Sequence, residues 1–212
     1  RYSLQERNTI FATFLVYLFH ISAGIGILLG YIEWFAVKTP LNLSLLVLLT
    51  IWVYPIDSMK KILAGLGFFL AGMLVEILGV QYGLFFGEYS YGANLGPKFM
   101  GVPLLIGFNW ALLIFLTGQM ANSLHSSKIL RVFTGSALML FLDYFMEKVA
   151  PQMDFWEFVL DPVPFSNYLA WFVIACLLHG VFQYLDIRGS RSFSWHAFAI
   201  QCLFFIFLCL YL

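Results

Sequence analysis

The sequence predicts an all-α membrane protein, a polytopic bundle of about seven transmembrane helices in a single domain that covers residues 1–212. Hydrophobic residues make up 62% of the chain and charged residues only 10%. Apolar stretches of spanning length, about 20 residues, recur along it. No repeat or soluble domain is apparent, and the formal net charge is zero. Nothing in the composition therefore indicates a nucleic-acid partner.

Apolar runs that approach spanning length place the predicted helices in order along the chain. They cover residues 9–32, 41–56, 62–81, 101–124, 129–149, 166–186 and 194–212, of which the second is the shortest. The first run has spanning length, and no small-residue cleavage site follows a short apolar core, so we expect no cleavable signal peptide. The chain begins at Arg1 without a Met, which is consistent with a start further upstream.

Basic residues orient the predicted bundle, because cytoplasmic loops collect Lys and Arg. Eight fall on the amino-terminal side of the predicted helices: Arg1, Arg7, Lys60, Lys61, Lys128, Arg131, Arg188 and Arg191. Three fall on the opposite side: Lys38, Lys98 and Lys148. We therefore expect a cytoplasmic amino terminus and an integral protein of the bacterial cytoplasmic (inner) membrane.

Acidic residues gather toward the predicted outer half: Glu33, Glu76, Glu88, Asp143, Glu147, Asp154, Glu157 and Asp161. Acids contribute little to orientation, so this bias predicts a polar cavity that opens toward the outer half. Its walls would be the helices at 62–81 and 129–149 and the two long outer loops. Alternatively, the loop acids Asp154, Glu157 and Asp161 are merely solvated.

The most isolated acid is Glu76, inside the apolar run 62–80, which contains no basic residue. A carboxyl group at membrane depth costs roughly 2.5–3.5 kcal/mol on insertion scales and usually has a function there. Gly72, Gly79 and Gly83 share its helical face. Such a face lets a neighbouring helix approach closely, or it could admit a flat, elongated ligand beside the carboxyl group.

A second acidic position is the pair Asp143 and Glu147, which are four residues apart and project from one side of a helix. Like charges this close in low dielectric do not comfortably both ionise, so one is expected to stay protonated. A protonated acid beside a carboxylate pairs a general acid with a general base. Alternatively, Lys148 or Arg131 neutralises the pair, or Glu147 lies at the water boundary.

Aromatic residues make up 19% of the chain. Around the expected outer-half site they are Tyr82, Tyr89, Tyr91, Trp110, Tyr144, Trp156, Tyr168 and Trp171. Most are expected in interface belts, and a subset could stabilise a carbocation through the ring quadrupole.

Other membrane chemistries lack their motifs. The four His form no HxxxH or HxxHH box, the last apolar run has no Lys for a retinal Schiff base, and no nucleotide or haem motif occurs. Cys176, Cys202 and Cys209 have no metal-site spacing and are expected to pack in helices. We therefore expect no metal site, and acid–base chemistry on a hydrophobic substrate.

Three ordered blocks then resemble one family. They are VEILGVQYGLFFGEYSYGANLGPKFMGVP (75–103), DYFMEKVAPQMDFWE (143–157) and VPFSNYLAWF (163–172). The blocks resemble the CruF-type carotenoid biosynthesis proteins, the carotenoid 1,2-hydratases. Two positions depart from the family pattern, which has DP where this chain has Glu147 and Lys148, and GW where it has Ala170 and Trp171.

The resemblance implies addition of water across the terminal C1,C2 double bond of an acyclic (psi) carotenoid end group, such as that of γ-carotene or lycopene. The product would be a tertiary alcohol, made without redox change or organic cofactor. The motif positions carried over are Glu76, Gly83, Gly87, Tyr89, Tyr91, Asp143, Glu147, Asn167 and Trp171.

Such a hydration needs a proton for the alkene, survival of a tertiary cation, and water to capture it. We expect Asp143 to donate the proton, Glu147 to be coupled to it, and Glu76 to position or deprotonate the water; exchanging the roles of Glu76 and Asp143 is nearly as plausible. Tyr89, Tyr91 and Trp110 would flank the cation, and Asn109 and Asn167 would hold the water. The polyene would reach this site laterally from the lipid bilayer.

Two other functions remain open. One is a carotenoid end-group cyclase, or a polytopic prenyltransferase that uses Asp143 and Glu147 in a magnesium–diphosphate site. The other is a non-catalytic pigment carrier or transporter with a proton relay. The sequence indicates neither the specific carotenoid nor the oligomeric state.

Overall fold

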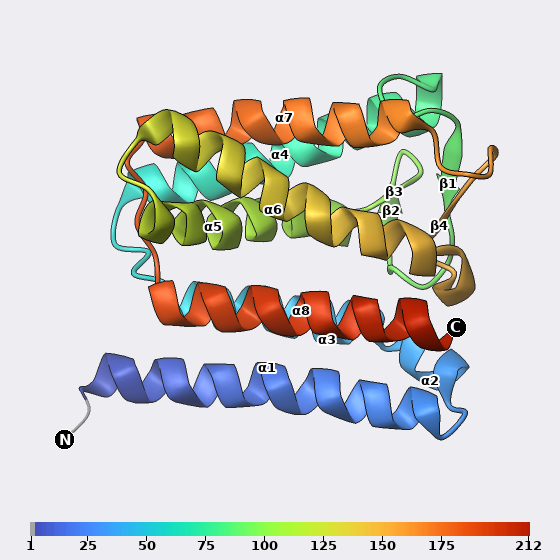
Figure 1. The fold of residues 1–212 in the computed structure, drawn as a ribbon, viewed down its shortest axis with the longest axis horizontal. Helices are drawn as coiled ribbons and strands as arrows, with labels where there is room; N and C mark the ends of the chain where they lie inside the picture. Colours follow the sequence, from blue (N-terminus) through green and yellow to red (C-terminus); the bar gives the residue numbers. More distant parts are fainter. Residues whose placement is uncertain (1–2) are drawn as a thin grey trace.

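A computed structural model describes residues 3–212, so Arg1, counted above among the basic residues, lies outside the described residues. The described chain forms long helices that lie side by side along one axis (Figure 1). They are α1 (Leu4–Leu28), α2 (Ile32–Val37), α3 (Thr39–Val53), α4 (Met59–Tyr82), α5 (Leu104–Leu124), α6 (Lys128–Val149), α7 (Phe165–Tyr184) and α8 (Arg191–Tyr211).

The fold class is confirmed, because each of the seven predicted ranges contains a helix. Of the eight helices in the described residues, six are long and apolar enough to cross a membrane, all except α2 and α3. The second predicted span corresponds to α3, whose 15 residues extend roughly 22 Å at 1.5 Å per residue. That is shorter than the hydrocarbon core of about 30 Å, so α3 is an apolar helix below the usual spanning length.

Both boundaries of the first predicted helix were wrong for local reasons. The helix predicted over 9–32 begins earlier, because Ser3 and Glu6 form a capping box ahead of Leu4. It ends at Leu28, and Gly30 follows in the left-handed region with φ +91°, which glycine adopts at no steric cost. A new short helix, α2, then starts at Ile32.

The helix predicted over 101–124 starts later, at Leu104. Residues just before it form a small antiparallel pair of β2 (Lys98–Phe99) and β3 (Val102–Pro103). Gly101 makes the turn between these strands with φ +85°. The first residues of the predicted helix are therefore strand and turn.

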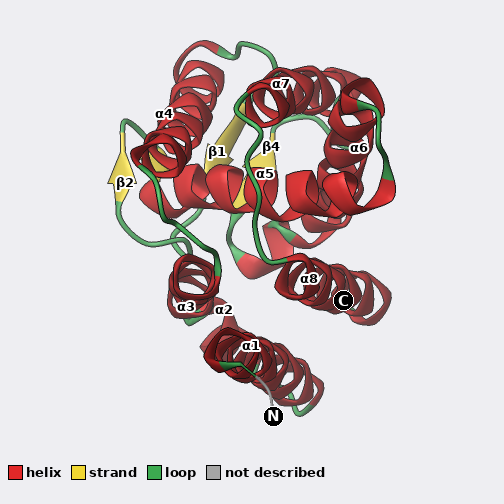
Figure 2. Ribbon diagram, turned by 90° about the vertical axis from the view of Figure 1, so that its left-hand side faces the viewer, coloured by secondary structure: helices red, strands yellow, loops and turns green. Residues whose placement is uncertain are grey.

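Viewed along the helices, α4, α5, α6 and α7 form one group, and α1, α3 and α8 lie beside it (Figure 2). Helix α5 contacts α3, α4, α6, α7 and α8 and is the most buried of the six spanning helices. Residues on α5 are therefore placed at the centre of the molecule, where Asn109 and Trp110 lie.

The two long loops that the sequence predicted come together at one end of the bundle. β1 (Tyr89–Tyr91) pairs antiparallel with β4 (Trp156–Phe158), with Tyr91 opposite Trp156. Asp154, exposed in its loop, accepts a hydrogen bond from Ala93 N at 2.9 Å through Oδ2. It therefore also ties the loops together. We call this end, which carries the four strands of the described residues, the strand end; α8 ends here, whereas α1 begins at the opposite end of the bundle (Figure 1).

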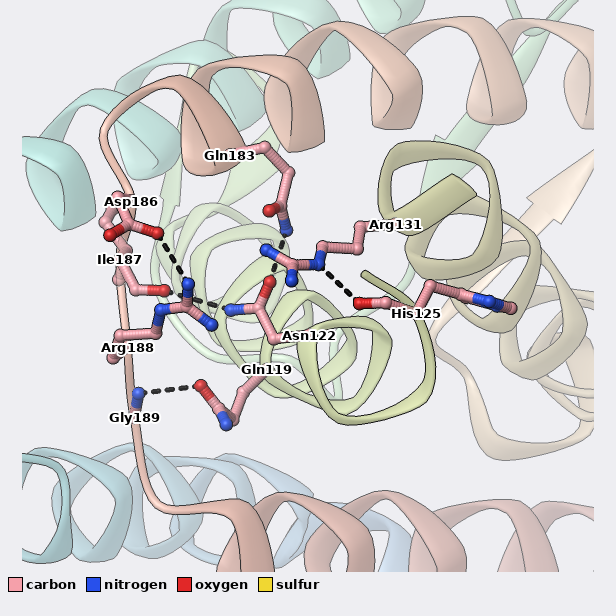
Figure 3. Close-up of polar contacts among 9 residues, drawn as sticks. All are labelled: Gln119, Asn122, His125, Arg131, Gln183, Asp186, Ile187, Arg188 and Gly189. Atoms are coloured by element: carbon pink, nitrogen blue, oxygen red, sulfur yellow. Dashed lines mark hydrogen bonds and ion pairs between the residues drawn. The ribbon is translucent and has the colours of Figure 1, made fainter. Parts of the chain in front are cut away.

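At the other end, polar side chains of α5 hold the segment between α7 and α8 (Figure 3). Asn122 Nδ2 donates to Ile187 O at 3.1 Å, and Gln119 Oε1 accepts from Gly189 N at 2.8 Å. Gln183 Nε2 in turn donates to Asn122 Oδ1 at 2.9 Å. The bonds to Ile187 O and Gly189 N satisfy backbone groups of this turn, which would otherwise need water as a partner.

Two glycines of α4 allow a test of its close packing against α5. A Cβ on Gly72 would lie 2.6 Å from Trp110 Cβ, whereas a Cβ on Gly67 would meet nothing within 4 Å. We expect Gly72→Ala to lower the free energy of unfolding by about 1–3 kcal/mol, because α4 must move away from α5. Thermal unfolding in detergent measures this.

Gly67→Ala is the matched control and should leave the midpoint unchanged or slightly raised, since Ala favours helix over Gly. Equal midpoints for both variants would contradict the close packing at Gly72.

Candidate active site

Glu76 lies on α4 with only 3% of its side chain exposed, and both carboxyl oxygens accept hydrogen bonds. Trp110 Nε1 of α5 donates to Oε1 at 2.9 Å. The hydroxyls of Tyr89 and Tyr91 on β1 donate to Oε2 at 2.6 and 2.8 Å. An indole N–H can only donate, so Oε1 is held as an acceptor. Three donors from two other elements thus compensate the burial of this carboxyl group.

The glycine face of α4 makes these contacts possible. A Cβ on Gly72 would meet the Trp110 side chain, and one on Gly79 would lie 2.6 Å from Tyr89 Oη. Aromatic side chains that bind Glu76 therefore lie against this face at Gly72 and Gly79.

The other two predicted glycines shape the chain after α4. Gly83 ends the helix in the left-handed region with φ +65°, and Gly87 follows with φ +102°. A Cβ on Gly87 would approach Pro164 to 3.2 Å. These two turns direct the chain into β1, and so bring the two tyrosines back over Glu76.

The β1 tyrosines remain donors over a wide pH range. Burial, and next the charge of Glu76, raise the pKa of Tyr89 and of Tyr91 above the ordinary phenol value. Their contribution to stability is therefore fully present below the phenol pKa of about 10 and is lost only at higher pH.

Asp143 and Glu147 on α6 are buried, with 2% and 4% of their side chains exposed. Glu147 accepts from Trp156 Nε1 at 2.7 Å and from Asn167 Nδ2 at 2.9 Å. Asp143 differs, because its buried Oδ2 has no hydrogen-bonding partner among residues 3–212. A buried polar atom in this state calls for an explanation, such as a small molecule that it contacts.

The structure does not have the alternative arrangements of this acidic pair, in which Lys148 or Arg131 neutralises it or Glu147 lies at the water boundary. Lys148 Nζ lies 4.8 Å from the centroid of the Tyr144 ring. Arg131 is at the opposite end of the bundle, where its Nε donates to His125 O at 2.7 Å. Glu147 is buried rather than at a water boundary.

All three carboxyl groups line one small cavity at the strand end, of about 20 Å³. It is lined by Glu76, Phe86, Tyr89, Tyr91, Ile106, Asn109, Asp143, Met146, Glu147, Trp156, Phe158, Asn167 and Trp171. A water needs about 10–15 Å³ of such volume and two to four polar partners. The cavity, which we call the carboxyl cavity, therefore has room for about one water molecule.

A much larger pocket adjoins it, of about 660 Å³. Residues of α1, α2, α3 and α8 form one side, and α5, α6 and the loop before β4 form the other. Four residues line both spaces: Ile106, Asn109, Met146 and Trp156. We call this the apolar pocket, since aliphatic and aromatic side chains make most of its wall. Its volume falls within the range of small-molecule sites, about 300–1,000 Å³.

Aromatic rings surround the carboxyl cavity on several sides. Trp110 and Trp171 stack with centroids 3.9 Å apart and planes 12° apart. Tyr89 stacks on Phe158 across the β1–β4 pair at 5.1 Å. These stacks hold aromatic rings in place beside the carboxyl cavity.

Comparison with known proteins now identifies the family. A family model described as carotenoid biosynthesis protein matches residues 39–211, most of the chain. The chain belongs to the carotenoid biosynthesis protein family. The match spans α3 to α8 and so includes every residue of the carboxyl cavity.

One curated protein with a similar sequence is bisanhydrobacterioruberin hydratase of Haloarcula japonica. It is 25% identical over 153 residues, which cover 66% of this chain and 50% of the relative. The chain thus spans about half the length of the curated relative it matches. No solved structure matches the chain.

The predicted site residues of this family member come together. Glu76, Tyr89, Tyr91, Asn109, Asp143, Glu147, Asn167 and Trp171 line the carboxyl cavity, and Trp110 contacts it through Glu76. Tyr82, 70% exposed, and Tyr144, 44% exposed, do not belong to it.

Four lining residues were not expected around the site, namely Phe86, Ile106, Met146 and Phe158, and Trp156 was expected there only as an aromatic residue without an assigned role. Trp156 binds Glu147 directly, and Met146 lies on the wall between the two spaces. Trp156 is the last but one residue of the second family block, so its place in that block was the available signal. Met146 precedes Glu147 in a helix, and nothing in the sequence marks it.

Proposed function

We propose that this protein is a carotenoid hydratase that adds water across the terminal C1,C2 double bond of an acyclic carotenoid end group. One observation carries the proposal: a carboxyl-lined cavity with room for about one water shares a wall with a large apolar pocket. A hydratase for a hydrocarbon needs these two environments side by side, one for water and acid and one for the chain.

The comparisons support the proposal. The family is one of carotenoid biosynthesis, and the Haloarcula relative is named a hydratase. Protonation of an alkene and capture of the cation by water require no electron transfer, and the groups they need are acids, bases and π faces.

Asp143 is the proposed proton donor. Its Oδ2 is buried at the carboxyl cavity without a protein partner, so it is free to carry a proton and direct it at the alkene. Transfer of that proton to C2 leaves a tertiary cation at C1. Water then adds its oxygen to C1 and loses one proton, so the net change is the addition of one water.

Glu76 is the proposed acceptor of the proton that water loses, and Glu147 is coupled to Asp143 through the shared cavity. The hydrogen bonds from Trp110 and from Trp156 hold one oxygen of each Glu as an acceptor. Transfer of that proton from Glu76 back to Asp143, through the next water that enters the cavity, restores both groups, so the proposed cycle uses no cofactor.

The aromatic wall would stabilise the cation. A ring face within about 6 Å of a cationic centre attracts it. Tyr89, Tyr91, Trp156 and Trp171 line the carboxyl cavity, and the stack of Trp171 on Trp110 keeps its ring in place. Asn109 and the Asn167 carbonyl oxygen would hold the water, since the amide nitrogen of Asn167 already donates to Glu147.

The polyene would lie in the apolar pocket, which it enters from the lipid of the bacterial cytoplasmic membrane. Its reacting end must pass the shared wall, because the carboxyl cavity is too small for an end group as well as water. Met146 on that wall is unbranched with three rotatable bonds, so it can change rotamer as the end group arrives.

The proton donor is tested by expressing the protein in a host that accumulates lycopene or γ-carotene. We expect a pigment heavier by one water with the wild type. Asp143→Asn should reduce the product at least about 100-fold, the usual contribution of a general acid. Chromatography with mass spectrometry measures the product, and detergent-solubilised yield measures folding.

Glu157→Gln is the matched control. Glu157 is exposed on β4, opposite Ser90, so this substitution removes a carboxyl group outside the cavity. It should keep full activity. Wild-type activity in Asp143→Asn would overturn the assignment of Asp143 as proton donor. Unchanged pigment with the wild type would overturn the proposed hydratase function.

Water capture is tested separately at Asn109, which lines both spaces. Asn109→Leu should keep alkene protonation but lower the alcohol about tenfold, the loss expected for one hydrogen bond. The cation then loses a proton again or closes a ring, so a product of unchanged mass should appear. Growth in deuterated water would label that product, and loss of both products together would contradict the separate role.

A further inference from the structure

The apolar pocket has a second polar region, on the wall formed by α1 and α8 and away from the carboxyl cavity. His20 of α1 and Gln201 of α8 line it, and each is only 5% exposed. Asn42, Thr39 and Lys38 also line the pocket but are more exposed, on α3 and beside α2. His20 and Gln201 are thus polar side chains buried inside an otherwise apolar wall.

Their hydrogen bonds decide which atoms they offer to a ligand. His20 Nδ1 is 2.8 Å from Val16 O. A carbonyl oxygen only accepts, so Nδ1 carries the hydrogen, and Nε2 of the neutral ring is an acceptor. Gln201 Nε2 donates to Ala197 O at 3.0 Å, which identifies the amide nitrogen and makes the other amide atom, Oε1, an acceptor.

A comparison within the protein shows that this arrangement differs from a structural histidine. His179 on α7 has contacts on both ring nitrogens, from Thr117 Oγ1 at 2.8 Å and Ala175 O at 2.8 Å, and it packs against Gly135. That ring holds helices together. The ring of His20 instead lies at a pocket, with Phe204 edge-on at 5.5 Å.

We propose that His20 and Gln201 form a binding site for a hydroxyl group on the polyene chain. A hydroxyl donates one hydrogen and accepts others, so it can donate to one of these two acceptors and accept the remaining amide hydrogen of Gln201. A charged group would lose its hydration in this apolar surrounding without a counter-charge. The inference rests on the proposed function, since it takes the occupant of the pocket to be a carotenoid.

The site would make the protein selective for polyenes that already carry a hydroxyl group away from the reacting double bond. The reactions that supply such a substrate must include an earlier hydroxylation or hydration of the chain. The two polar regions of the pocket would then fix the chain at two points, and so set which double bond meets Asp143.

The test measures binding rather than turnover, so it does not depend on the hydratase reaction. Polyene binding to purified protein quenches tryptophan fluorescence, and Trp34 and Trp156 both line the pocket. The probes are an acyclic polyene hydrocarbon and the same polyene with one hydroxyl group. We expect the wild type to bind the hydroxylated probe about tenfold more tightly, the value of one net hydrogen bond.

His20→Phe and Gln201→Leu should remove that preference and leave the affinity for the hydrocarbon within about twofold. Hydrocarbon affinity also reports that the variants are folded. Tyr17→Phe is the matched control, because it removes a contact between α1 and α8, from Tyr17 Oη to His196 Nδ1, outside the pocket. It should keep the preference.

Equal affinity of the wild type for the two probes would overturn the hydroxyl site, as would a preference that survives in both variants. Neither result would affect the hydratase, which the pigment experiment tests. Conversely, if the protein shows the preference but adds no water, the proposed hydroxyl site is supported and the proposed hydratase function is overturned.

Discussion

The hydrogen bonds to the buried carboxyl group of Glu76 are the interaction on which the rest of the site depends. They tie α4 to α5 through Trp110 and to β1 through two tyrosines. β1 pairs with β4, and β4 carries Trp156, the donor to Glu147. A carboxyl group that must be paired in a low-dielectric interior thus organises the strand end, and through it the second carboxyl group.

The three acids differ in their hydrogen bonds. Glu76 and Glu147 each have oxygens held by N–H donors, whereas Asp143 Oδ2 is buried without such a partner among residues 3–212. The three meet in a space for about one water, beside a pocket large and apolar enough for a polyene. The hydration that we propose would need fixed acceptors, a proton donor and little water, since excess water would allow side reactions.

Much of this could be predicted from sequence. Apolar runs located the helices, the isolation of Glu76 in such a run marked it, and four-residue spacing put Asp143 and Glu147 on one face. The β1–β4 pair and the apolar pocket could not be predicted, because each joins segments far apart in the chain. Local hydropathy gives the length of an apolar segment but not its partner, and it also missed the end of α1 at Leu28, which the backbone of Gly30 sets.

The most direct test of the central claim is an experimental structure of the Asp143→Asn protein with an acyclic carotenoid bound. The account predicts the chain in the apolar pocket and its terminal double bond at the wall made by Ile106 and Met146. Residue 143 should be the acid position nearest the less substituted alkene carbon, with a water between it and Glu76. A carotenoid bound on the outer, lipid-facing surface, or one whose end lies away from the three carboxyl positions, would contradict the account.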